Sequence, residues 1–138
     1  KRAMGRKVIT AMGGDVRGRT VAVLGLTFKP NTDDMRDSPA IAVVQTLQDA
    51  GATIRAFDPE GQEQARKMLE NIEYCEDAYD AMKGADALVI ITEWDVFRAL
   101  DLKRAKELLS QPVLVDLRNI YPREQVEAAG FTYTAVGR

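Results

Sequence analysis

The stretch that decides the fold is residues 21–39, VAVLGLTFKPNTDDMRDSP. It opens with an apolar run that is typical of a strand covered on both faces. It closes with residues 37–39, DSP, which favour a helix start, because Asp or Ser caps a helix and Pro suits its first turn. The loop between them carries Lys29 and Arg36. We therefore expect a strand, a charged loop and a helix, with the loop at the carboxyl end of the strand, where open α/β sheets bind ligands.

The rest of the chain continues this alternation of strands and helices. Strands are predicted over residues 20–26, 53–57, 87–91, 113–116 and 131–136, and helices over 1–12, 38–50, 62–71, 74–83, 102–109 and 123–129, with an uncertain short strand before residue 74. Such alternation implies βαβ units. We expect an α/β, Rossmann-like three-layer sandwich with a mainly parallel sheet, preceded by the tail of a long helix.

Bulk properties exclude several classes of function. The chain has 138 residues, enough for one domain, and a net charge of -2, which argues against non-specific nucleic-acid binding. It has no apolar run long enough to span a membrane. It has no histidine, and its carboxylates lack ligand spacing, so no metal site is predicted. The acidic pI of 5.2 and the absence of a visible targeting signal lead us to expect a cytoplasmic protein, and the lone Cys75 fits a reducing compartment.

Two cations and an aromatic residue follow predicted strands. Lys29 and Arg118 would approach one crevice at the carboxyl edge of the sheet, and a phosphate or diphosphate would suit them. Phe28 offers an apolar surface beside them. Each residue also has a plainer interpretation: Lys29 as a solvated lysine, Phe28 as a core residue, and Arg118 as a structural partner of Asp116.

Other residues point away from a complete dinucleotide site. Gly25 stands alone where a dinucleotide-binding turn has three glycines. Asp58 lies where such folds place a ribose-binding acid, but the proline after it favours a turn or cap role. Arg36 could pair with an aspartate of its own loop. Cys75 lies among acidic residues that would raise its pKa, and Trp94 has no decided role.

Four segments resemble the nucleotide-sugar dehydrogenase family, that is, the UDP-glucose/GDP-mannose dehydrogenases, in their C-terminal UDP-binding domain. In chain order they are residues 25–39 (GLTFKPNTDDMRDSP), 85–94 (ADALVIITEW), 115–119 (VDLRN) and 136–138 (VGR). The first is long and specific, and the other three corroborate it. The resemblance implies that residues 1–14 end the helix linking two domains and that residues 15–138 form the UDP-sugar-binding domain of a longer enzyme.

The resemblance also implies roles for the charged loop residues. The family oxidises the 6-hydroxymethyl group of the sugar to a carboxylate with two NAD molecules in succession, through a covalent cysteine adduct. Phe28 and Lys29 would contact the UDP-sugar, and Arg118 would reach the substrate either within its own subunit or across the interface of a homodimer. Arg36 would touch NAD, which binds mainly to the N-terminal domain. The catalytic cysteine lies upstream in the family, so we expect no catalytic residue in this chain and no dehydrogenase activity from it alone.

Three functional hypotheses remain. Residues 27–32 and 92–94 favour, by resemblance, an enzyme that converts UDP-glucose to UDP-glucuronate. The same domain could instead serve a GDP-mannose or a UDP-N-acetylhexosamine dehydrogenase. A non-enzymatic, Rossmann-type nucleotide-sensing domain would also lack the cofactor glycines and the nucleophile.

Overall fold

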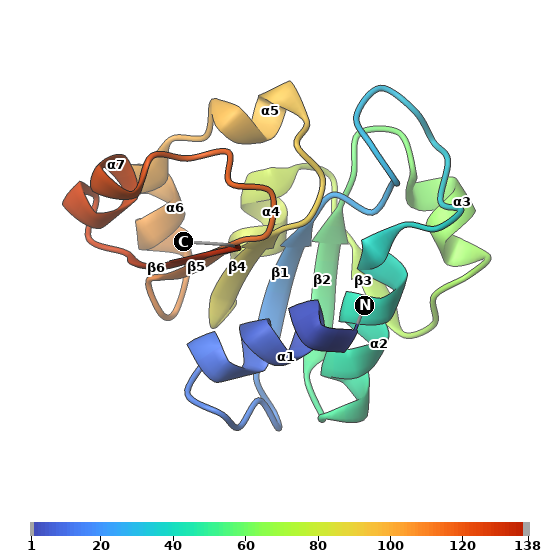
Figure 1. Ribbon diagram of the computed structural model, residues 1–138, viewed down its shortest axis with the longest axis horizontal. Coiled ribbons are helices and arrows are strands. Elements are labelled where there is room, and N and C mark those ends of the chain that lie inside the picture. The colour runs from blue at the N-terminus through green and yellow to red at the C-terminus, as the bar shows by residue number, and fades with distance from the viewer. Residues whose placement is uncertain (1, 137–138) are drawn as a thin grey trace.

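A single parallel sheet organises the computed structural model, which describes residues 2–136. Its strands lie in the order β3-β2-β1-β4-β5-β6, and all five strand pairings are parallel (Figure 1). The strands are β1 Thr20–Leu24, β2 Thr53–Phe57, β3 Ile72–Tyr74, β4 Ala87–Ile90, β5 Val113–Asp116 and β6 Thr132–Ala135. The expected Rossmann-like α/β fold is thus confirmed, and the sheet is wholly parallel.

The central strands are apolar because both of their faces are covered. Every residue of β4 is buried, as are four of the five residues of β1. Val23 in β1 lies opposite Ala56 in β2 on one side and Val89 in β4 on the other. The sequence at these strands is therefore a continuous apolar run rather than an alternating one.

Helices pack on both faces of the sheet and enclose two apolar cores. The elements α1 Arg2–Ala11, α2 Pro39–Asp49 and α3 Gln62–Arg66 contribute to one core. The elements α4 Ala78–Met82, α5 Asp95–Arg98, α6 Leu102–Leu108 and α7 Arg123–Ala128 contribute to the other. No helix among the described residues is long and apolar enough to cross a membrane.

The leading helix α1 is integrated into this domain. Val8 is fully buried in the same core as α2. A Cβ added at Gly5 would lie 2.7 Å from the Cβ of Thr46, so the two helices are in close contact at this point. The division at residue 14 into a linking helix and a UDP-sugar-binding domain stays a prediction. Lys1, Gly137 and Arg138 lie outside the described residues, and with them most of the closing VGR motif.

Some predicted boundaries were wrong. The helix predicted over 62–71 ends at Arg66, and the chain then turns through Asn71, whose φ of 58° is left-handed, into the short β3. The helix predicted over 74–83 begins only at Ala78, after a cap by Asp77. Residues 95–98, for which no helix was predicted, form the one-turn helix α5. The strand predicted to reach residue 26 ends at Leu24.

Candidate functional site

The candidate site lies along the carboxyl edge of the sheet. The chain leaves β1 towards β2 on one side, whereas β4 lies on the other side of β1, so the strand order reverses between β1 and β4. Loops after such a switch point form the usual ligand crevice of an open α/β sheet. Here the loop of residues 25–38, which follows β1, and the helix α5, which follows β4, lie along the upper edge in Figure 1.

Asp58 anchors the first of these loops. Its carboxylate is buried, and one oxygen, Oδ2, accepts hydrogen bonds from the backbone N–H groups of Leu26 and Thr27 at 2.7 and 3.2 Å. The other oxygen, Oδ1, accepts from the N–H groups of Glu60 and Gly61 at 2.9 and 2.7 Å. Because both oxygens are occupied by the protein's own backbone, Asp58 holds the loop rather than a ribose, in agreement with the predicted turn role.

A close approach of backbones joins the β1 loop to the β4 loop. Gly25 has a φ of 95°, and a Cβ there would lie 2.5 Å from the backbone nitrogen of Thr92. The hydroxyl of Thr92 donates to the carbonyl of Thr27 at 2.8 Å. The single glycine of this turn therefore serves the contact between the two loops.

Phe28 and Lys29 lie on the exposed part of the first loop. Phe28 is 44% exposed, so the interpretation of this residue as core is wrong. Its backbone N–H donates to the carbonyl of Asp34 at 2.8 Å, which closes the loop on itself. Lys29 is exposed, and its carbonyl accepts a hydrogen bond from the hydroxyl of Thr27. The loop thus presents an aromatic ring and an ammonium group side by side in sequence and open to solvent.

Arg36 pairs within its own loop. Its Nε and Nη2 donate to the two carboxylate oxygens of Asp34 at 3.1 and 3.0 Å, a bidentate arrangement. These hydrogen bonds hold the pKa of the Asp34 carboxyl below its ordinary value. The Arg36 side chain is nevertheless 87% exposed, so it keeps an open face towards solvent.

Two carboxylates hold Arg118: Asp116 accepts from its backbone, and Glu93 accepts from its side chain. Its backbone N–H donates to Oδ1 of Asp116 at 3.1 Å, while its Nε and Nη2 both donate to Oε2 of Glu93, at 3.0 and 2.6 Å. Burial raises the pKa of Glu93, but the hydrogen bonds and charge of Arg118 outweigh burial, so the pKa lies below its ordinary value. The predicted structural pairing with Asp116 uses only the backbone, and the pairing with Glu93 was not predicted.

Asp116 itself belongs to a buried network. Its Oδ2 accepts from the backbone N–H of Tyr121 at 3.0 Å and from the hydroxyl of Tyr133 at 2.8 Å. The Tyr121 hydroxyl donates to the carbonyl of Phe97, and burial raises the pKa of Tyr121 to about 12. This network fixes the end of β5 and therefore the position from which Arg118 starts.

Contacts between the loops place Lys29 and Arg118 at one edge. The Thr92 hydroxyl ties the β1 loop to the β4 loop, and Glu93 ties the β4 loop to Arg118 after β5. Because β1 and β5 are separated only by β4, their ends are about 10 Å apart at a strand spacing of 4.7–4.9 Å. The loops that carry Lys29 and Arg118 therefore leave the sheet at the same edge.

The first βα turn does not fit the diphosphate of a dinucleotide. In dinucleotide folds that group lies on free N–H groups at the start of the following helix. Here Pro39, which has no N–H, opens α2, and the Ser38 hydroxyl already accepts from the N–H of Ala40 at 3.2 Å. Arg36 is the one residue of this chain that is predicted to touch NAD.

Two residues left open by the sequence are buried. Trp94 is 7% exposed and packs in the apolar core with Phe97. Cys75 is also buried, and burial is the main cause that raises the pKa of its thiol above the ordinary value, while the nearby charge of Arg55 partly opposes it. A raised pKa and low exposure make a poor nucleophile, as predicted. No group of three or more potential metal-ligating residues occurs within residues 2–136.

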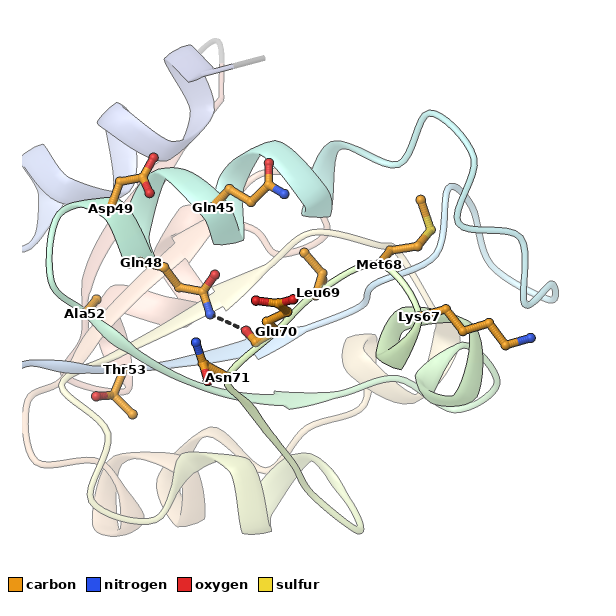
Figure 2. A pocket seen from close by; sticks show the side chains of 10 residues that line it. All are labelled: Gln45, Gln48, Asp49, Ala52, Thr53, Lys67, Met68, Leu69, Glu70 and Asn71. Carbon is orange, nitrogen blue, oxygen red and sulfur yellow. Dashed lines mark hydrogen bonds between the residues drawn. The ribbon is translucent and has the colours of Figure 1, made fainter.

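A separate hollow of about 600 Å³ lies near the amino-terminal ends of β2 and β3. It is bounded by Gln48 on α2, Thr53 at the start of β2 and Asn71 just before β3 (Figure 2). The Gln48 amide donates across it to the carbonyl of Glu70 at 2.7 Å. Its residues precede strands rather than follow them, so this hollow is not part of the charged edge.

This architecture defines the class of protein. A parallel sheet in the order β3-β2-β1-β4-β5-β6, with its charged loops at the switch point, is that of Rossmann-type domains. The chain belongs to the UDP-glucose/GDP-mannose dehydrogenase family, whose UDP binding domain matches residues 22–123. The matched range includes Phe28, Lys29, Arg36 and Arg118.

Curated relatives and solved structures agree with this assignment. The chain is 64% identical over 138 residues to the UDP-glucose 6-dehydrogenase of Rhizobium meliloti (strain 1021), covering 100% of the chain and 32% of the relative. It is 44% identical over 133 residues to the UDP-glucose 6-dehydrogenase TuaD of Bacillus subtilis (strain 168), covering 96% of the chain and 29% of the relative.

Among solved structures, the UDP-glucose dehydrogenase of the archaeon Pyrobaculum islandicum matches with a TM-score of 0.76 and 32% identity, covering 96% of this chain and 29% of that one. The chain therefore spans about a third of the length of the relatives that it matches.

Proposed function

We propose that this chain is the UDP-sugar-binding part of a UDP-glucose 6-dehydrogenase, a cytoplasmic enzyme that oxidises UDP-glucose to UDP-glucuronate with two NAD molecules. The observation that carries the proposal is the linkage of three loops, through Thr27–Thr92 and Glu93–Arg118, which brings two cations to one edge. The 64% identity to a UDP-glucose 6-dehydrogenase over the whole chain supports UDP-glucose as the substrate.

The proposed roles follow from the chemistry of the exposed groups. Lys29 supplies a point charge to the diphosphate, and Arg118 supplies directional N–H donors to the UDP-sugar. Phe28 offers an exposed ring against which the apolar face of the ligand packs. Arg36, held on Asp34 but open to solvent, touches NAD that is bound mainly by the rest of the enzyme.

The residues of this chain bind and orient but do not carry out the oxidation. The only cysteine is buried with a raised pKa, and the first βα turn does not fit a dinucleotide diphosphate. We therefore expect no NADH production from UDP-glucose by this chain alone. The proposed partners are the remainder of the same enzyme and a second copy of it in a homodimer.

Ligand-observed NMR with the purified chain tests the proposal directly. UDP-glucose, GDP-mannose and NAD are compared at equal concentration, with Lys29→Ala as the test variant. Lys83→Ala is the matched control, because Lys83 is also exposed but follows α4, at the opposite edge of the sheet.

The expected result is selective contact with UDP-glucose that Lys29→Ala abolishes and Lys83→Ala leaves intact. Equal contact with GDP-mannose would point to another member of the family. Contact that survives Lys29→Ala would contradict the assignment of the diphosphate to the β1 loop.

A further inference from the structure

The ion pair between Arg118 and Glu93 has an unusual geometry. An arginine commonly meets a carboxylate as a fork, with two parallel hydrogen bonds to its two oxygens. Here both donors, Nε and Nη2, meet the single oxygen Oε2. The second oxygen, Oε1, is buried and has no hydrogen-bond partner among the described residues. The pair therefore leaves one carboxylate oxygen of Glu93 unsatisfied.

This geometry is a poor one for stability alone. A buried, unpaired polar atom costs free energy, and a partly exposed ion pair returns little. The side chains of Arg118 and Glu93 are 30% and 26% exposed, so water screens their attraction in part. The pair is not explained by what it contributes to folding.

The same geometry leaves part of the guanidinium available. Within residues 2–136 its hydrogen bonds use Nε and Nη2, so the two N–H donors of Nη1 have no protein acceptor there. The backbone of Arg118 is fixed at its other end by the buried Asp116. Arg118 is thus held at its backbone and at Nε and Nη2, while the N–H groups of Nη1 are available to a ligand.

We propose that Glu93 is a positioning residue of the binding site, which fixes the Arg118 guanidinium so that Nη1 meets an anionic sugar nucleotide. This inference rests on the proposed function. A free arginine must lose side-chain freedom when it binds a ligand, whereas one already held by Glu93 has lost it beforehand. Glu93 acts through Arg118 and does not touch the ligand itself.

The alternative explanation, that Glu93 only neutralises the charge of Arg118, predicts the opposite change in UDP affinity when Glu93 is replaced. If Glu93 only neutralised Arg118, removing its charge would strengthen binding of an anion. If Glu93 positions Arg118, Glu93→Gln weakens UDP binding by about three- to tenfold, the effect of ordering one flexible side chain. The binding of UDP after Glu93→Gln therefore separates the two.

Isothermal titration of UDP into the purified chain is the first measurement. The variants are Glu93→Gln, Arg118→Ala and the double variant of both. The matched control is Glu73→Gln, which breaks the ion pair of Glu73 with Arg55 at 2.5 Å on β2 and β3, away from the charged edge. We expect the control to bind UDP as the wild type does and the double variant to bind no more weakly than Arg118→Ala.

The rate at which the Arg118 Nε–H proton exchanges with water, followed by NMR, reports on the Glu93 contact separately from the stability of the fold. In the wild type this proton is held by Glu93 and should exchange slowly with water. Glu93→Gln should speed its exchange while the backbone spectrum outside the β4 and β5 loops stays unchanged.

Each outcome decides a different claim. Equal or tighter UDP binding by Glu93→Gln would overturn the positioning role and leave UDP binding standing. Fully additive losses in the double variant would also overturn it, since Glu93 would then act independently of Arg118. Failure of the wild type to bind UDP would instead overturn the proposed function, and this inference with it.

Discussion

Replacing Asp58 by asparagine should destabilise the protein strongly, although the two side chains have almost the same shape. Each carboxylate oxygen accepts at least two hydrogen bonds, Oδ2 from Leu26 and Thr27 and Oδ1 from Glu60 and Gly61. An amide has only one oxygen, so either orientation turns an NH₂ group towards two backbone N–H donors. Two hydrogen bonds to a charged acceptor are lost, at about 1.5–3 kcal/mol each, for a total of about 3–6 kcal/mol.

Urea unfolding of the wild type and of Asp58→Asn measures this difference. Asp33→Asn is the matched control, because Asp33 is an exposed aspartate of the same region, and it should change the free energy of unfolding by less than about 0.5 kcal/mol. A loss below about 1 kcal/mol for Asp58→Asn, at an unchanged urea dependence, would refute the claim that this carboxylate holds the β1 loop.

Three further outcomes are expected. Gly25→Ala should lower the free energy of unfolding in urea by about 2–4 kcal/mol, because Gly25 has a positive φ and an added Cβ would clash with Thr92. Gly13→Ala is the control, since Gly13 also has a positive φ but no atom lies within 4 Å of an added Cβ. If Gly25→Ala lost no more stability than Gly13→Ala, the clash would be contradicted. Ser38→Ala should lower the free energy of unfolding by about 1 kcal/mol, because α2 loses its cap and the carbonyl of Leu26 loses a hydrogen-bond donor. An unchanged thermal unfolding temperature would contradict a stabilising role for the cap. Tyr121, whose pKa burial raises from 10.0 to about 12, contributes stability that is complete below pH 10 and is lost as the pH rises to about 12. The measurement is the urea midpoint of unfolding between pH 10 and about 12, together with tyrosinate absorbance. A midpoint that did not fall as tyrosinate formed would contradict the prediction.

The fold could be predicted well from sequence where a single physical cause dominates. The strands at 53–57 and 113–116 have the predicted bounds, because Asp58-Pro59 ends the first and Asp116 ends the apolar run of the second. The helix at 62–71 could not be bounded, because its last residues turn into an edge strand whose pairing with β2 is a tertiary effect. The turn α5 was missed because its formation depends on burying Phe97 rather than on helix propensity.

The site was predicted in its parts but not in its connections. That Lys29 and Arg118 both follow strands at the carboxyl edge of one sheet can be read from the alternation of strands and helices. Glu93 and Arg118 are 25 positions apart, and nothing local to either residue indicates their pairing. Strand order decides it, because β4 and β5 are neighbours in the sheet. The anchoring of the first loop by Asp58 depends in the same way on the pairing of β1 with β2.

The strand order also bears on how the molecule folds. The hydrogen bond that joins the two halves at the switch point connects Thr27 and Thr92, which are 65 positions apart. Closing so long a stretch of chain costs entropy before any contact repays it, and parallel pairings of this kind make folding slow. We expect β1 and β2 to assemble with α2 before β4 docks on β1. The crevice between these loops would then form only when β4 docks, so that a chain caught half-folded would have no binding site.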